Sequence, residues 1–139
     1  MLSKLLCAAL LCAPAFAQTY TVTPFGVRCG GTLHGQVVNT PLGAGLRLRV
    51  AHASPNTVTV LVLGSLAAVP QPLPGTNCML LVDPRGTEAT ITDGRGNASF
   101  GLRLPSTVPF TVHLQAATID FNRRGRAVET TNGLQVDGF

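Results

Sequence analysis

The chain has 139 residues, of which 45% are hydrophobic and 12% are charged, with ten basic against six acidic side chains. This length suits one domain with one core, and beyond the N-terminal segment no apolar run is long enough to span a membrane. The modest positive charge permits weak attraction to anionic polymers. The arginines are not interleaved with aromatic residues, so the sequence does not predict a nucleic-acid partner.

The first 17 residues have the three parts of a secretory signal. A short basic start that contains the only lysine, Lys4, is followed by an apolar stretch and by a small-x-small ending at Ala17. We therefore expect a signal peptide at residues 1–17, cleaved near Ala17, and a mature domain at residues 18–139. The alternative is an ordinary buried helix. Cleavage would place the domain in the periplasm, at the cell surface or outside the cell.

Two cysteines, Cys29 and Cys78, remain after removal of the signal. In an oxidising compartment disulfides persist, and a single pair has only one intramolecular connectivity. We expect a Cys29–Cys78 disulfide that closes a loop of about 50 residues and stabilises the fold by up to roughly 4 kcal/mol in the chain-entropy model.

The mature chain begins with short extended segments separated by glycine and proline. We expect an edge strand at residues 19–24, where Pro24 limits pairing, and a short strand at residues 33–38. Residues 39–45 contain one proline and two glycines, which predicts a loop.

Two segments then have clear strand patterns. Residues 46–50 alternate aliphatic side chains with Arg47 and Arg49, which predicts a strand with both arginines facing solvent. Residues 58–63 are apolar and β-branched at nearly every position, as is typical of a central strand covered on both faces. We expect residues 46–53 and 58–63 to pair as a hairpin.

Residues 65–77 carry three prolines and predict a stiff connection that crosses between sheets. An apolar strand at residues 78–82 follows, and the Asp-Pro-Arg-Gly sequence at residues 83–86 predicts a type I turn that stops it.

The clearest pattern surrounds the Asp-Gly-Arg-Gly turn at residues 93–96. Apolar and polar residues alternate on both sides of it, and after it Phe100 falls on the buried face and Arg103 on the solvent face. Residues 88–104 are therefore predicted to form a β-hairpin.

The last third of the chain continues the strand pattern. Residues 110–116 alternate and place His113 on the solvent face, residues 122–126 form a polar, basic loop, and Leu134 and Val136 mark a final strand. About eight short strands without an amphipathic helix predict an all-β fold, a single antiparallel β-sandwich of Ig-like or Greek-key type.

Groups that carry chemistry are sparse. The mature chain has three histidines, His34, His52 and His113, and none has a histidine or cysteine at metal-ligand spacing. The loop that starts at Asp93 is similar to the beginning of a calcium loop, but Arg95 stands where an oxygen ligand is needed. We expect no catalytic residues, metal or cofactor. A weak calcium site, and a small hydrolase with converging His, Asp and Ser, are the alternatives.

The sequence thus favours a non-enzymatic, exported structural or interaction domain. The rival hypothesis is a binding module for polysaccharide or another anionic surface polymer, with Arg47, Arg49 and Arg103 as contacts if their strands are neighbours. The chain has no tryptophan and one tyrosine, so aromatic stacking on sugars has few residues to use. The partner stays open between a cell-surface protein and a polysaccharide.

Several structural motifs follow one another along the mature chain: Cys-Gly-Gly-Thr from Cys29, Thr-Asp-x-x-Gly-Asn-Ala from Thr92, and Thr-Asn-Gly-Leu from Thr131. In this order they resemble a family of small exported bacterial β-sandwich domains, although Phe121 stands where that family often has proline. The resemblance implies a sandwich at the cell envelope or outside the cell. The family has no established catalytic residues, so no site is carried over.

Overall fold

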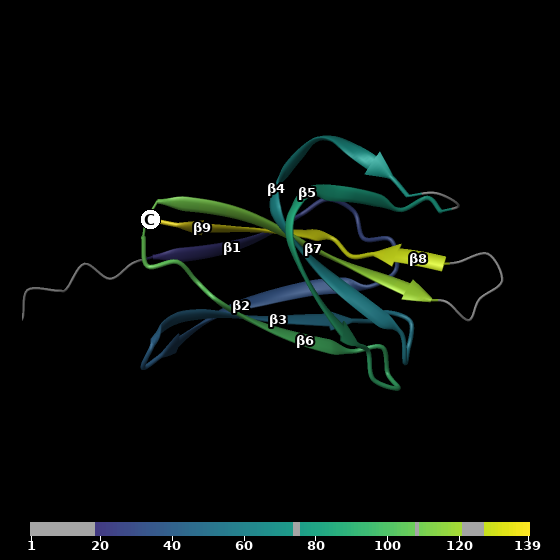
Figure 1. Ribbon diagram of the computed structural model, residues 1–139, viewed down its shortest axis with the longest axis horizontal. Coiled ribbons are helices and arrows are strands. Elements are labelled where there is room, and N and C mark those ends of the chain that lie inside the picture. Colours follow the sequence, from purple (N-terminus) through teal and green to yellow (C-terminus); the bar gives the residue numbers. More distant parts are fainter. Residues whose placement is uncertain (1–18, 74–75, 108, 121–126) are drawn as a thin grey trace, which may run out of the picture.

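The computed structural model describes residues 19–73, 76–107, 109–120 and 127–139, and every regular element in these ranges is a strand (Figure 1). The strands are β1 (Tyr20–Phe25), β2 (Thr32–Thr40), β3 (Gly43–Ala51), β4 (Val58–Pro72), β5 (Met79–Ile91), β6 (Ala98–Arg103), β7 (Phe110–Asp120), β8 (Ala127–Thr130) and β9 (Gly133–Gly138). The predicted all-β fold is confirmed. The predicted signal at residues 1–17 and the loop at residues 122–126 lie outside the described residues.

The strands form two antiparallel sheets that pack face to face (Figure 1). The six-stranded sheet has the order β1-β9-β7-β4-β5, with β8 paired to β7, and the three-stranded sheet has the order β2-β3-β6. Aliphatic side chains from both sheets are removed from water between them, and this burial is the main stabilising contribution. The fully buried members of this core include Leu33, Leu46, Leu48, Val50, Leu61, Leu114 and Val136.

Both predicted hairpins are wrong in their pairing. β3 pairs with β2 and β6, whereas β4 belongs to the other sheet, and the same separation holds for β5 and β6. The links at residues 52–57 and 92–97 therefore carry the chain from one sheet to the other. They lie side by side, since Thr92 N–H donates to Thr57 O at 2.8 Å and Thr57 N–H donates to Thr92 Oγ1 at 2.9 Å. A tight turn can serve a hairpin or such a crossing equally well.

The actual hairpin in this region is β2–β3, where Thr40 faces Gly43 across a two-residue tip. The predicted loop at residues 39–45 is therefore wrong except for the two residues of the tip. Gly43 and Gly45 weaken the strand pattern at the start of β3, but pairing with β2 on one side and β6 on the other satisfies its backbone.

The predicted connection at residues 65–77 is wrong, because β4 continues to Pro72 and pairs with the start of β5. The predicted turn at residues 83–86 also lies inside β5, where a register shift after Leu63 brings Gly64 opposite Pro84. Gly64 is required at this bulge, since a Cβ there would collide with the carbonyl oxygen of Asp83. Beyond the bulge the β4–β5 ribbon curves over the outer face of the six-stranded sheet (Figure 1).

This ribbon buries polar side chains on the outer face of β7. Gln115 is fully buried, and its Oε1 accepts from Leu81 N–H at 2.8 Å while its Nε2 donates to the carbonyls of Met79 and Thr131 at 3.0 and 2.9 Å. His113, predicted to face solvent, is only 9% exposed and lies edge-on to the ring of Phe25 at 5.6 Å. That prediction is wrong because Phe25 of β1 packs over His113. Strand alternation shows which face of β7 a residue lies on, but not whether another element covers that face.

The Cys29–Cys78 disulfide is present and joins the β1–β2 link to the start of β5 across 49 positions of sequence. Cys29 N–H also donates to the carbonyl of Thr130 at 2.7 Å, so the link is held against β8. A disulfide of this kind is typical of proteins in oxidising, extracytoplasmic compartments. In the ranges that the structure describes, no helix has the length and hydropathy needed to cross a membrane.

Candidate functional site: the arginine face of the three-stranded sheet

The three predicted contact residues lie on one face of one sheet. Arg47 and Arg49 are two residues apart on β3, and β6 is the direct neighbour, with Gly101 opposite Arg47. Arg103 lies two residues further along β6, diagonal to Arg47. Outward positions two apart are about 7 Å from each other along a strand, and diagonal neighbours are about 7–8 Å apart. The condition set by the sequence analysis, that the strands be neighbours, is met.

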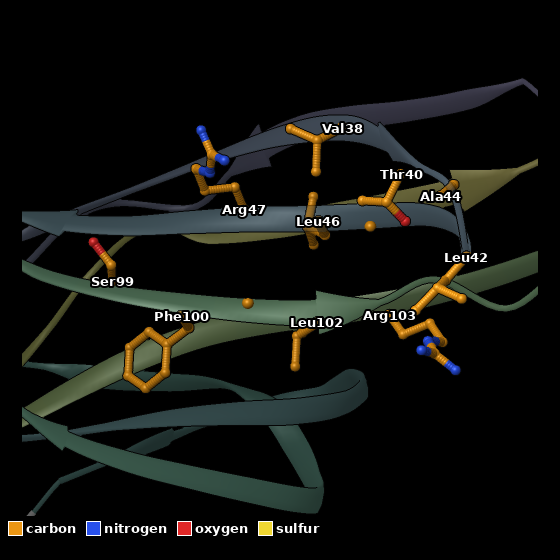
Figure 2. Close-up of a pocket in the computed structure, with 12 residues that line it drawn as sticks. Val38, Thr40, Leu42, Ala44, Leu46, Arg47, Ser99, Phe100, Leu102 and Arg103 are labelled. Atoms are coloured by element: carbon orange, nitrogen blue, oxygen red, sulfur yellow. The ribbon is translucent and has the colours of Figure 1, made fainter.

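Strand alternation separates this face from the core. Arg47, Arg49 and Arg103 are exposed, whereas Phe100 on β6 is buried. Figure 2 shows Arg47 and Ser99 on the side of the sheet opposite to Phe100. The guanidinium groups are therefore presented to solvent by a sheet whose other face is fixed by the core.

The strands that carry this face have basic side chains and no acidic ones. β2, β3 and β6 contain no aspartate or glutamate. The six carboxylates of the chain are on β5, β7, β8, β9 and the β5–β6 link: Asp83, Glu88, Asp93, Asp120, Glu129 and Asp137. The potential over the three-stranded sheet is therefore positive and suits an anionic partner.

A shallow groove of about 640 Å³ lies along the β3–β6 pair. Gly45 and Gly101 leave its floor without side chains, and a Cβ at Gly101 would meet no atom within 4 Å. The walls, several of which are drawn in Figure 2, come from Val38, Thr40, Leu42, Arg47, Ser99 and Arg103. The groove thus combines a floor without side chains at Gly45 and Gly101 with two arginines, Arg47 and Arg103, in its lining.

A second depression of about 500 Å³ adjoins the groove over β2 and β3. It is lined by His34, Gln36, Arg47 and Arg49 together with Gly35, and Arg47 belongs to both hollows. Arginine side chains form two parallel hydrogen bonds with a carboxylate or phosphate, so this arrangement can bind anionic groups.

Asp93 borders the face, but its carboxylate is hydrogen-bonded within its own turn. Its Oδ1 accepts from the N–H groups of Asn97 and Arg95 at 2.9 and 2.8 Å. These bonds, that from Asn97 first, hold the pKa of the carboxyl below its ordinary value of 3.8, with nearby Arg95 and Arg49 adding to the effect. Asp93 Oδ1, which the calcium hypothesis would use as a ligand, thus accepts backbone hydrogen bonds that hold the link between the sheets.

The histidines lie on separate parts of the fold. His34 is exposed on the outer face of β2, His52 is in the β3–β4 link with a φ of 59°, and His113 is buried on β7. Among the described residues, no group of three His, Cys, Asp or Glu side chains could hold a metal ion.

The fold and the site together define a disulfide-linked two-sheet domain with an arginine face. Comparison with protein-family models, with curated proteins and with solved structures finds no match. The resemblance to exported bacterial sandwich domains therefore stays a prediction.

The arginines were predictable from the sequence, but the residues that shape the site were not among the predicted contacts. Gly101 was taken only as a strand position, Gly45 was assigned to the predicted loop at residues 39–45, and His34 was taken as a surface histidine. Gly101 could have been found, because the alternation that puts Arg103 outward puts Gly101 outward as well.

Proposed function

We propose that the mature chain is a non-enzymatic, exported interaction domain that binds an anionic surface polymer through Arg47, Arg49 and Arg103. The observation that carries the proposal is the convergence of these arginines on one exposed face whose three strands contain no carboxylate. Arginine is suited to carboxylate and phosphate recognition because its planar fork matches both groups. The contact surface is rigid, since its reverse side is the core.

Export is the second part of the proposal. The signal pattern in residues 1–17 and the Cys29–Cys78 disulfide support it. Intact mass of protein recovered outside the cytoplasm tests it. The expected species starts at Gln18 and is two hydrogens lighter than the reduced chain, whereas a full-length, reduced species confined to the cytoplasm would refute export.

The binding proposal is tested by retention on an immobilised acidic polysaccharide. We expect the wild-type domain to be retained at low salt and released as salt rises, since charge contacts between exposed groups are screened. The Arg47→Ala/Arg49→Ala variant should elute at clearly lower salt. Single variants Arg47→Ala and Arg103→Ala are compared with Arg85→Ala, which removes one exposed charge from β5 on the other sheet.

If Arg85→Ala weakens retention as much as Arg47→Ala, binding follows net charge and the arginine face is not a site. If the wild-type domain fails to bind the acidic resin at any salt concentration, the anionic-polymer proposal is wrong.

A further inference from the structure

The groove and its neighbour belong to a longer series of hollows. A third depression lies at the β1–β2 link and is lined by Arg28, Thr32, His34 and Asn132 among others, and a fourth lies beyond Arg103, with Tyr20, Leu42 and Ser106. Consecutive hollows share a lining residue, in turn His34, Arg47 and Arg103. We call this connected series the basic track.

The charged side chains that line the track are all basic. Its cationic side chains are Arg28, Arg49, Arg47 and Arg103, and none of the residues that line its four hollows is an aspartate or glutamate. Arg28 is exposed and lies at one end of the series, whereas Arg103 lies between the last two hollows. Positive groups are thus distributed along a path instead of being gathered around one point.

From this arrangement, and resting on the proposed function, we infer that the ligand is a linear acidic polysaccharide that lies along the basic track from Arg28 to Arg103. An open path with cations at intervals fits a chain with repeated carboxylates, while a single small anion would use only one hollow. Gln36 and Ser99 line the path between the arginines and add neutral hydrogen-bonding groups. Such groups suit the hydroxyls of sugar rings between charges, which a polyphosphate lacks.

In the central part of the track, binding of a sugar chain would not use stacking on aromatic side chains. The floor at Gly45 and Gly101 has no side chain on which a sugar could stack, and Phe100 belongs to the core. The arginines of the track would therefore recognise the spacing of negative charges along an extended ligand chain. Affinity should therefore depend on chain length.

The test is a titration of the full mature domain with oligouronates of graded length at low salt. For wild type we expect affinity to rise with length until the chain spans the track and then to level off. Arg28→Ala should weaken binding of long chains about fivefold, the effect of one exposed charge pair, and leave short chains unaffected. Arg28→Lys retains the charge and should recover much of the loss, and thermal unfolding verifies that each variant is folded.

The outcomes separate the two proposals. Loss of binding in Arg47→Ala/Arg49→Ala, with no effect of Arg28→Ala at any length, leaves the arginine face as the site but overturns the track. Affinity that is already maximal for the monosaccharide overturns the track as well. Polyphosphate of matched charge that binds more tightly than every uronate overturns the polysaccharide assignment. No binding to any polyanion overturns the proposed function itself.

Discussion

At the residue scale, two side-chain amides, the half-buried Asn132 and the fully buried Gln115, replace backbone pairing where strands end. The Asn132 side chain accepts from Leu33 N–H at 3.0 Å and donates to Leu33 O at 3.1 Å, so it joins the six-stranded sheet to β2 as a strand partner would. Gln115 does the same for Leu81 and Met79 at the start of β5. Backbone groups buried at these places need partners, and the amides provide both a donor and an acceptor.

We predict that Gln115→Leu lowers the free energy of unfolding by about 2–4 kcal/mol. The leucine has a similar volume but leaves Leu81 N–H and two carbonyls without their partner. Denaturant unfolding measures the effect. The control is Gln71→Leu at an exposed position of β4, where we expect a change below about 0.5 kcal/mol. A loss no larger than that of the control would show that Gln115 does not hold the ribbon.

Acid stability is a second residue-scale prediction. The pKa of Asp93 lies below its ordinary value because of hydrogen bonds from Asn97 and Arg95, and that of Asp137 is lowered by Thr111 and Gln135. A lowered folded-state pKa favours the folded state at neutral pH, and this contribution is lost as pH falls through the folded-state value.

Asp93→Asn removes the charge but retains a side-chain oxygen that can accept. Wild type should therefore exceed the variant in melting temperature at neutral pH, and the difference should shrink as pH falls below about 4. Melting curves across this range measure it. A difference that is constant, or that grows toward acid, would contradict the role assigned to the carboxylate.

At the scale of elements, the sequence predicted where strands lie better than how they pair. Alternation located β6 and β7 and correctly put Arg47, Arg49 and Phe100 on their faces, because the period of a strand is local. The Asp93 turn was taken for a hairpin, yet it joins the two sheets. Partner choice depends on distant strands, so the turn residues alone could not decide it.

The length of β4 and β5 was predicted wrongly for a related reason: the prolines in residues 65–77 and 83–86 were taken as the ends of strands. Proline lacks the N–H that a ladder needs, which argues locally against a strand. Pro84 is accommodated at the bulge opposite Gly64, and Pro72 ends β4. This ribbon covers Gln115, and Phe25 covers His113. Both contacts come from tertiary packing, so no periodic pattern in the sequence predicts them.

The direction of the site's side chains was predictable from the sequence, but the arrangement of its strands was not. The outward direction of the arginines comes from local alternation, but the adjacency of β3 and β6 was only a condition until the structure showed it. The contribution of Arg28 to the basic track depends on the β1–β2 link lying beside His34, which no local pattern contains.

The groove floor gives an element-scale prediction. A Cβ at Gly101 would meet no atom within 4 Å, and valine is β-branched and suits a strand, so we expect Gly101→Val to raise stability by about 0.5–1 kcal/mol while polyanion binding falls. Gly86→Val on β5 is the control, because a Cβ there also meets no atom within 4 Å. It should raise stability similarly and leave binding unchanged. Unaltered binding by Gly101→Val would show that the ligand does not use the groove.

At the scale of the whole molecule, charge is divided between the two layers. The three-stranded sheet carries three arginines and no carboxylate, and five of the six carboxylates are on strands of the other sheet. The core and the disulfide fix both layers in one orientation, so the domain presents a permanently basic side. This polarity would orient the domain as it approaches an anionic surface.

The most direct test of this account is amide chemical-shift mapping of residues 18–139 during titration with an acidic polysaccharide. The account predicts shifts that concentrate on β2, β3, β6 and the β1–β2 link, with Gly101 and Arg47 among the largest. Shifts confined to the six-stranded sheet, or to the exposed apolar residues Leu66, Val69 and Met79 of the β4–β5 ribbon, would contradict it.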